Sequence, residues 1–305
     1  MMVRLFTRFL LVVAVSVHSV WAVGFDGLRI TLLSTGSPLA SSEGFGPSTL
    51  VEAGDEVLLF DCGRGSLQRL TQAGVPLRDI TAVFLTSLEP DNVAGCDELW
   101  LARGQAVDAD ALPVWGPEGT IDLVRKRNTD MGSSAPRADA ADPHEIGENV
   151  TYQTADVTVT AIVADHPPLA QAFGYRVDYA GRAVVLSGDT RFSENIIRSA
   201  RGVNVLVHEV AAANAAALEA SDRVRGVMAM HTSPEEAGMV FRAARPYLAV
   251  YSRQLLFGIT ESELMRRTRR TYNGSLEIGH DLMVIEVQNE VQVRSLPSGG
   301  RRDAQ

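Results

Sequence analysis

Hydrophobic positions in this chain form two kinds of pattern. Short runs rich in Val, Ile and Leu predict strands at residues 28–34, 49–51, 57–61, 80–86, around Val114, and at 157–163, 173–179, 183–187, 203–208 and 248–251. Segments with a helical repeat follow Gly65 and cover 93–103, 117–127, 234–244 and 261–271. Two further runs, 282–287 and 291–294, predict a closing hairpin around Asn289 and Glu290. Strands dominate and helices follow them, which predicts an α/β (α+β) fold with sheets covered by helices on their outer faces.

A polar stretch from Met131 to Asn149 divides the chain into two similar halves. It contains Pro136, Pro143 and several Asp and Ala residues. We expect an exposed connection here, and not a linker between separate domains.

The N-terminus has the pattern of an export signal. Arg4 and Arg8 precede an apolar run, 9–17, that is too short to span a bilayer, and Val20-Trp21-Ala22 offers small residues at a cleavage step. We expect cleavage after Ala22 and a periplasmic or secreted product; a membrane anchor left uncut is the alternative.

The remaining chain predicts one domain. Residues 1–22 are assigned to the signal peptide, 23–294 to a single domain, and 295–305, with Pro, Gly and Arg, to a disordered tail. No other stretch is long and apolar enough to cross a bilayer, so we expect no membrane contact after cleavage.

Composition and net charge limit the classes of partner that we expect this chain to bind. The chain is 46% hydrophobic and 21% charged, as in globular proteins, and its formal charge is -9, which becomes more negative once Arg4 and Arg8 are removed. A nucleic-acid binder needs clustered basic side chains against phosphates. We therefore expect no nucleic acid partner, and a small-molecule ligand or ester substrate instead.

The chain has two cysteines, Cys62 and Cys96. They are too few for a disulfide framework and too far apart for a zinc knuckle. In an oxidising compartment they could bridge, since each follows a predicted strand, but two buried free thiols are the expectation that cysteine usage favours.

Polar residues gather after three sets of predicted strands, where turns can aim side chains into one cleft. The segments are 84–95, then 164–167 with 186–190, then 207–209 with 230–234. Taken singly, Thr86 and Ser233 suit caps, Asp91 suits the start of a helix, and His231 suits a buried hydrogen bond.

The order of these segments resembles the metallo-β-lactamase superfamily, and more narrowly its ribonuclease Z and arylsulfatase-like branch. The resemblance runs from about Leu28 to Arg294 and is carried by FDCGRG, SGDTR, NVLVHEV, MHTSPEEAG and TYNGSLEIGHDLMVIEV. It implies a four-layer αβ/βα sandwich, two mixed sheets flanked by helices, with a metal cleft along one edge.

The metal-binding motif departs from that family. Active members read T-H-x-H-x-D-H where this chain reads T-S-L-E-P-D-N. Four of the seven expected ligands are thereby replaced, and the replaced positions are Ser87, Glu89, Asn92 and, at the final histidine position, Ser252. The family pattern is kept at Asp91, at His166, and at Asp189, which corresponds to the carboxylate that bridges two metals.

The remaining donors favour a different ion. Serine and a neutral amide are poor zinc ligands, so a dinuclear zinc centre is not expected. If Glu89, Asp91, His166 and Asp189 converge, the site is oxygen-rich and suits at most one divalent ion, Mn²⁺, Mg²⁺, Ca²⁺ or Zn²⁺.

Without an ion, the carboxylates would repel each other and need a cation. Arg253 follows the lost ligand at Ser252 and could turn its guanidinium toward Asp91, Asp189 and Glu89. Alternation of side chains along a strand favours the other outcome, in which Arg253 points outward.

The proton-handling residues implied by the resemblance are kept. Glu209 and His231 stand where the family assists the leaving group, and Asp91 is the candidate base that orients water.

Two functions follow. In the first, an exported homologue that is impaired or inactive as a dinuclear zinc hydrolase, a possible pseudoenzyme, binds a ligand or partner in the old cleft. In the alternative, an active hydrolase of phosphoesters, sulfate esters or other esters uses one nonstandard metal ion.

Overall fold

The computed structural model describes residues 25–36, 45–105, 110–130, 140–147 and 149–296. The expected signal peptide and residues 297–305 of the expected tail lie outside these ranges. Within them, no helix is long and apolar enough to span a membrane.

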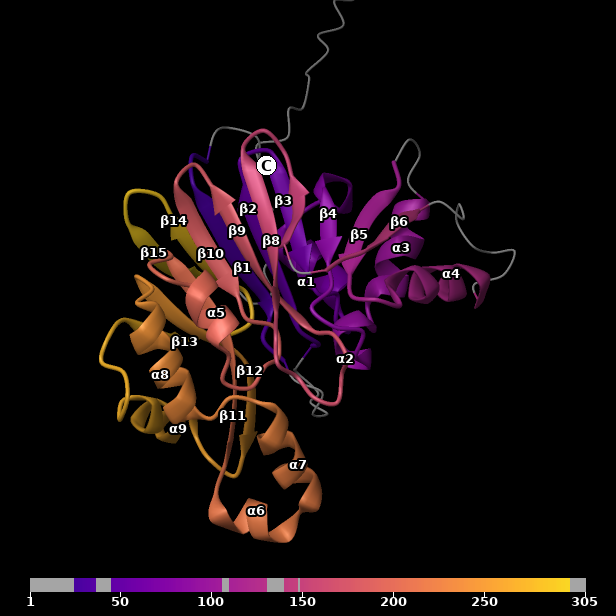
Figure 1. Cartoon of the computed structure of the whole chain (residues 1–305). Helices are drawn as coiled ribbons and strands as arrows, with labels where there is room; N and C mark the ends of the chain where they lie inside the picture. Colours follow the sequence, from indigo (N-terminus) through magenta and orange to yellow (C-terminus); the bar gives the residue numbers. More distant parts are fainter. Residues whose placement is uncertain (1–24, 37–44, 106–109, 131–139, 148, 297–305) are drawn as a thin grey trace, which may run out of the picture.

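Two mixed β-sheets form the centre of the fold (Figure 1). The first sheet has the order β15 (Val291–Ser295), β14 (Met283–Val287), β1 (Leu28–Ser34), β2 (Ser48–Ala53), β3 (Glu56–Phe60), β4 (Ala82–Phe84), β5 (Leu112–Gly116) and β6 (Ala141–Glu145). The second has the order β13 (Leu276–Ile278), β12 (Leu248–Phe257), β11 (Val205–Ala213), β10 (Arg182–Leu186), β9 (Phe173–Tyr179), β8 (Val157–Val163) and β7 (Asn149–Gln153). The sheets pack face to face, because buried residues of both, such as Leu28, Phe84, Tyr175 and Val250, share one core cluster.

Helices cover the outer face of each sheet. The first half contributes α1 (Ser66–Ala73), a 3₁₀ turn (Leu77–Asp79), α2 (Pro90–Val93), α3 (Cys96–Gly104) and α4 (Thr120–Asp130). The second contributes α5 (Glu194–Ser199), α6 (Ala215–Ala220), α7 (Asp222–Met230), α8 (Pro234–Ala244) and α9 (Glu261–Thr268). Separate apolar clusters join α1, α3 and α4 to the first sheet and α5, α8 and α9 to the second. The four-layer αβ/βα sandwich is therefore confirmed.

Several elements begin and end where the pattern predicts. β1, β8 and β9 match their predicted ranges, and so does α8. This helix starts at Pro234 because Ser233 and Glu236 form a capping box, in which each side chain bonds the other residue's backbone N–H.

Other elements differ from the sequence predictions. The polar stretch 131–149, expected to be an exposed connection, contains the edge strand β6. Asp142 and Glu145 of this strand are exposed, so its sequence lacks the apolar run that predicts a strand. Residues 131–139 lie outside the described ranges. The predicted helix 93–103 is split into α2 and α3 at Gly95. β15 ends at Ser295, the first residue of the expected tail.

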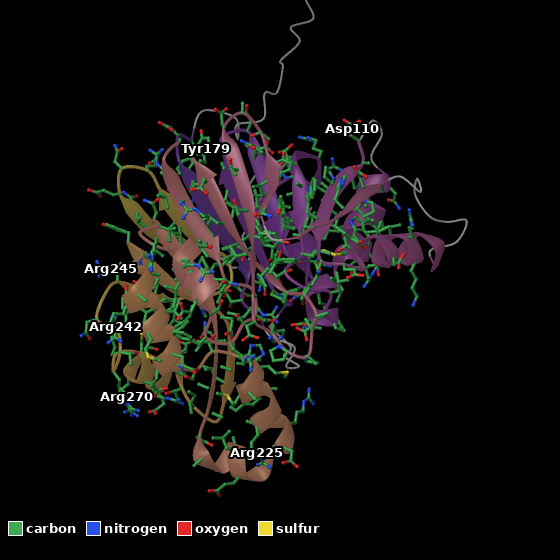
Figure 2. All side chains as sticks on the ribbon, viewed as in Figure 1. Asp110, Tyr179, Arg225, Arg242, Arg245 and Arg270 are labelled. Carbon is green, nitrogen blue, oxygen red and sulfur yellow. A yellow bond between two sulfur atoms is a disulfide. The ribbon has the colours of Figure 1, made fainter. Side chains whose placement is uncertain are left out.

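The longest strands extend beyond the sandwich. β11 and β12 continue to Ala213 and Phe257, well past their predicted ends, and carry α6 and α7 between them (Figure 1). Neither helix has a buried residue, and Arg225 on α7 lies in the part of the molecule below both sheets (Figure 2), where its guanidinium donates to the carbonyl of Leu218 on α6. The hydrophobic pattern predicted no element in this part of the chain.

Cys62 and Cys96 form a disulfide, so the expectation of free thiols is wrong. The backbone N–H of Gly95 donates to the carbonyl of Cys62 at 2.8 Å, which holds the start of α3 against the turn after β3. The two Cα atoms are consequently 5.3 Å apart, within the usual range for a disulfide.

Candidate functional site

The candidate site lies at one edge of the sandwich, where loops from both sheets meet. The first sheet supplies Asp61 after β3 and the 86–92 segment after β4; the second supplies His166 after β8, Asp189 after β10, Glu209 in β11, His231 after α7 and Arg253 in β12. All of the side chains predicted from the sequence come to this edge.

Arg253 occupies the centre of the site. Its Nη2 atom lies 2.8 Å from Asp91 Oδ2 and 2.6 Å from Asp189 Oδ2, and its Nη1 donates to the amide oxygen of Asn92. We call these four residues the Arg253 cluster. The guanidinium thus pairs with both carboxylates that the family pattern would use for metal, and the expectation that Arg253 points outward is wrong.

A β-bulge aims Arg253 inward. His208 pairs with Tyr251 and Val210 with Gln254, so Glu209 alone faces two residues of β12, Ser252 and Arg253. Arg253 adopts φ 50°, a left-handed conformation that a non-glycine residue takes only when its surroundings hold it there. The bulge breaks the alternation on which the outward expectation rested.

Asp189 depends on this arginine. Its side chain is 2% exposed, and neither carboxylate oxygen accepts a hydrogen bond from a described residue, because the contact with Arg253 is an ion pair without hydrogen-bond geometry. Burial raises the pKa of Asp189, while the Arg253 charge opposes this rise. For Arg253 itself, burial would lower the pKa, but the charges of Asp189 and Asp91 raise it.

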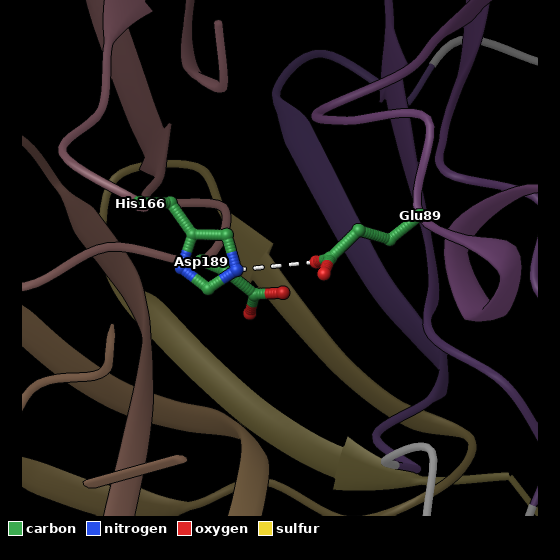
Figure 3. Close-up of side chains that lie close together, drawn as sticks. All are labelled: Glu89, His166 and Asp189. Carbon is green, nitrogen blue, oxygen red and sulfur yellow. Dashed lines mark hydrogen bonds and ion pairs between the residues drawn. The ribbon is translucent and has the colours of Figure 1, made fainter. Parts of the chain in front are cut away.

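Glu89, His166 and Asp189 form a compact set of possible metal ligands (Figure 3). One ligand atom from each lies within 4.8 Å of the others, which confirms part of the predicted convergence. Asp91 is not in this set and meets Asp189 only through Arg253.

The His166 ring lies between a backbone carbonyl and the carboxylate of Glu89. Its Nδ1 lies 3.0 Å from the carbonyl oxygen of Met230 and its Nε2 lies 3.1 Å from Glu89 Oε2. A carbonyl and an ionised carboxylate only accept hydrogen bonds, so this arrangement favours the doubly protonated imidazolium form of the ring. Burial alone would lower the pKa of His166, but the hydrogen bond to Glu89 and the nearby charge of Asp189 raise it. In return, the hydrogen bond from His166 lowers the pKa of Glu89 despite its partial burial.

Two of the replaced ligand positions, Ser87 and Asn92, belong to one hydrogen-bond network with Thr86. The amide of Asn92 donates to the hydroxyl of Ser87 at 2.7 Å and to that of Thr86 at 3.2 Å. The Ser87 hydroxyl also accepts from the backbone N–H of Glu89. Ser252 is buried and lines a small cavity with Asp61, His208 and Glu209.

Glu209 and His231 form a buried pair beside Asp189. Glu209 Oε2 lies 2.9 Å from His231 Nδ1, and Glu209 Oε1 accepts the backbone N–H of Thr232 at 2.8 Å. Ligand atoms of Asp189, Glu209 and His231 also lie within 4.8 Å of one another. The carboxylate therefore fixes the orientation of the imidazole, as proton transfer requires.

Two buried residues were missed as members of the site. Asp61 accepts from the backbone N–H and the hydroxyl of Thr86, both at 2.8 Å, and adopts φ 57°. His208 donates from Nδ1 to the carbonyl of Glu209, and its Nε2 has no described partner. An acid directly after a buried strand, before Cys-Gly-Arg-Gly, was the available signal for Asp61; the sequence carries none that would distinguish His208.

The site has an excess of negative groups. Five carboxylates, from Asp61, Glu89, Asp91, Asp189 and Glu209, share the site with one guanidinium and the three imidazoles of His166, His208 and His231. The donor set does not fit two zinc ions, because Arg253 pairs with Asp91 and with Oδ2 of Asp189. Asp189 Oδ1 has no described hydrogen-bond partner, so Asp189 can still join Glu89 and His166, and these two carboxylates and one imidazole fit one divalent ion by their donor chemistry.

Comparison with known proteins identifies the class. A model of the β-lactamase superfamily domain matches residues 57–252. The metallo-beta-lactamase fold protein YhfI from Bacillus subtilis superposes with a TM-score of 0.70 at 19% identity over 85% of this chain and 99% of that one. Human tRNase Z, short form, has a TM-score of 0.66 at 18% identity, covering 88% and 99%. The chain belongs to the metallo-β-lactamase superfamily.

Relatives with similar sequences identify the branch of the superfamily to which the chain belongs. Ribonuclease Z of Mycobacterium sp. (strain KMS) is 33% identical over 286 residues, 89% of this chain and 100% of the relative. Ribonuclease Z of Mycobacterium avium (strain 104) is 33% identical over 275 residues, 85% and 98%. The ribonuclease Z branch is thereby confirmed, whereas the arylsulfatase-like side of the resemblance stays a prediction.

These relatives also correct the expected partners. The exclusion of nucleic acid rested on net acidic charge, and proteins named for ribonuclease activity align with nearly the whole chain. Net charge is a sum over the surface and says little about one cleft, so that exclusion is wrong.

The first prediction concerns Asp61. Burial raises its pKa from the ordinary 3.8 to about 7, against the hydrogen bonds from Thr86. The folded protein therefore holds a proton that the unfolded chain has lost, and this contribution to stability is full below pH 3.8 and disappears as the pH rises through about 7. Asp61→Asn, which removes the titrating group and suits a left-handed backbone, should gain stability relative to the parent between about pH 5 and pH 8.

Urea unfolding at both pH values measures the difference. Asp222→Asn, at a side chain that is 95% exposed, controls for the change of charge. An identical pH dependence in the parent and Asp61→Asn would contradict the assignment.

The second prediction concerns Arg253. Arg253→Ala leaves Asp91 and Asp189 without their cation and should lower the free energy of unfolding by about 3 kcal/mol. Arg191→Ala, which breaks a half-exposed pair with Asp165, is the control and should cost about 1 kcal/mol or less. Because the loss comes from stranded charge, adding Asp189→Asn should recover part of it. Equal losses in the two single variants by urea unfolding would show that the cluster has no special importance.

Proposed function

We propose that this chain is a metallo-β-lactamase-fold protein that has lost dinuclear zinc hydrolysis and binds a small-molecule ligand or ester in the old cleft. The observation that carries this proposal is the Arg253 guanidinium, which lies within 2.8 Å of both Asp91 and Asp189. It supplies the positive charge that paired metal ions supply in active relatives.

Electrostatics and donor chemistry both support this loss. A divalent ion placed between Asp91 and Asp189 would lie against a fixed guanidinium, and repulsion between close cations is strong where the side chains are buried. Ser87, Asn92 and Ser252 would add only neutral oxygen donors, which hold zinc poorly. Asp91, expected as the base that orients water, is instead engaged by Arg253.

A single ion is compatible with the rest of the cleft. Glu89, His166 and Asp189 would hold it, and when bound it would attract a carbonyl or anionic oxygen of the ligand. The ion would replace the proton between His166 and Glu89. Binding of Mn²⁺, Mg²⁺, Ca²⁺ or Zn²⁺ should therefore weaken as the pH falls and His166 is protonated.

The alternative function is hydrolysis with one metal ion. The buried Glu209–His231 pair, at 2.9 Å, favours it because an oriented imidazole is what a leaving group needs. Phosphoesters, sulfate esters and other esters are the substrate classes, and an RNA phosphodiester belongs among them because of the ribonuclease Z relatives. Loss of metal-dependent turnover in Glu209→Gln, with metal binding kept, would support this alternative.

The third prediction separates one metal from two. Purified protein should hold at most one equivalent of divalent metal by elemental analysis. Restoring histidine at Ser87, Glu89, Asn92 and Ser252 should not create a zinc pair while Arg253 is present, because its charge remains in the site.

Adding Arg253→Ala to the four histidines should allow two equivalents of zinc and raise the melting temperature with zinc, since an ion that binds only the folded state stabilises it. Two zinc equivalents in the unaltered protein would overturn the proposal. A zinc pair in the four-histidine variant that keeps Arg253 would show that the guanidinium is no barrier.

We also propose that the protein is exported to the periplasm or beyond the cell. Arg4, Arg8 and the apolar run 9–17 support this, and so does the Cys62–Cys96 pair, because structural disulfides persist in oxidising compartments. The fourth prediction is that native-source protein begins at residue 23 and contains no reactive thiol. N-terminal sequencing and thiol titration measure both; an intact Met1 with two free thiols would contradict export.

A further inference from the structure

Exposed arginines gather at the outer edge of the second sheet, although the chain as a whole is acidic. Arg242 lies in the last turn of α8, Arg245 ends that helix, and Arg201 follows α5; all three are exposed. Figure 2 shows Arg242 and Arg245 pointing outward along one side of the molecule, with Arg270 further along the same side.

Backbone hydrogen bonds bring the two segments together. Gly202 N–H donates to the carbonyl of Ala244 at 2.9 Å, and Tyr247 N–H donates to the carbonyl of Val203 at 2.9 Å. Arg201 and Arg245 are therefore neighbours on the surface although 44 positions separate them. We call Arg201, Arg242, Arg245 and Tyr247 the arginine edge.

The positive charges of the arginine edge are not balanced by ion pairs within the described part of the chain. None of its arginines forms an ion pair with a described carboxylate, whereas the nearby Arg267 and Arg270 both pair with Glu235. A helix C-terminus favours basic residues, which suits Arg242 and Arg245 at the end of α8 and Arg201 just after α5. Because the two helices end side by side, their basic residues form one exposed surface.

Tyr247 adds an aromatic ring to the same surface. It is 64% exposed, the highest value among the large exposed apolar side chains of the described residues. Tyrosine combines an apolar ring with a polar hydroxyl, and this combination suits the boundary between water and lipid headgroups.

We propose that the arginine edge docks on the anionic phospholipid headgroups of a membrane. Grouped arginines are attracted to a negatively charged bilayer surface, and one tyrosine can enter the headgroup layer. A single-stranded nucleic acid is the less suitable partner, because it needs a groove with several stacking rings. The arginine edge has one ring and lies on the outer side of the molecule, and the cavity at the candidate site is lined by other residues. Docking of this kind does not depend on the function of the cleft.

The fifth prediction tests this surface with the full chain and vesicles of phosphatidylglycerol and phosphatidylcholine. Co-sedimentation should exceed that with phosphatidylcholine alone and should fall as salt is added, because the attraction is between exposed charges. The double variant R242E/R245E should bind at least about tenfold more weakly, from roughly fivefold for each basic charge lost.

The matched control is R223E/R225E on α7, which changes the net charge equally at exposed residues away from the arginine edge. All three proteins are prepared with the same N-terminus, so any contribution from residues 1–22 is the same in each. The control should keep at least half of the parent's binding. Equal losses in both double variants would attribute binding to net charge and overturn the proposal. The proposal would also fail if the parent did not bind anionic vesicles at low salt, or bound a single-stranded oligonucleotide but not the vesicles.

Discussion

The ion pairs of Arg253 with Asp91 and Asp189 are the constraint on which the arrangement of this cleft depends. Buried carboxylates are tolerated only when a cation or hydrogen-bond donors compensate for the lost water. In a dinuclear enzyme the metal ions do this, and the apoprotein is left with repelling acids. Here the compensating charge is covalently attached to β12, so one positive charge faces Asp91 and Asp189 in the folded cleft without any ion.

The position of Arg253 in turn depends on two local features. The bulge opposite Glu209 turns its side chain inward, and the α2 segment presents Asp91 and Asn92 to it. That segment is held at its C-terminal side: the N–H of Cys62 donates to the carbonyl of Asn92 at 2.9 Å, and the Cys62–Cys96 disulfide anchors the helix that follows. The disulfide thus stabilises one wall of the cleft as well as the fold.

The sequence predicted the parts of the molecule that one element determines by itself. β1, β8 and β9 alternate or run apolar because their faces are buried, and α8 carries its capping box and its Pro at the first turn. The sequence did not predict the features that depend on contacts between two elements. β11 and β12 are long because they pair with each other beyond the rest of the sheet. The polar residues of β12 at the bulge interrupt its apolar run, so the sequence pattern did not predict that the strand continues. The direction of Arg253 depends on a left-handed backbone that no residue type in this segment indicates.

The two halves of the site therefore differ in the group that faces their carboxylates. Beside Asp91, the positive charge is the guanidinium of Arg253. On the other side, the Glu89 carboxylate and the His166 imidazole are in contact, and the ring is held in place by the carbonyl of Met230 at the end of α7. The second arrangement stays compatible with an ion because the proton that joins His166 to Glu89 can be exchanged for one. The cleft as a whole can therefore accommodate a single cation, because its carboxylates outnumber its fixed positive charge.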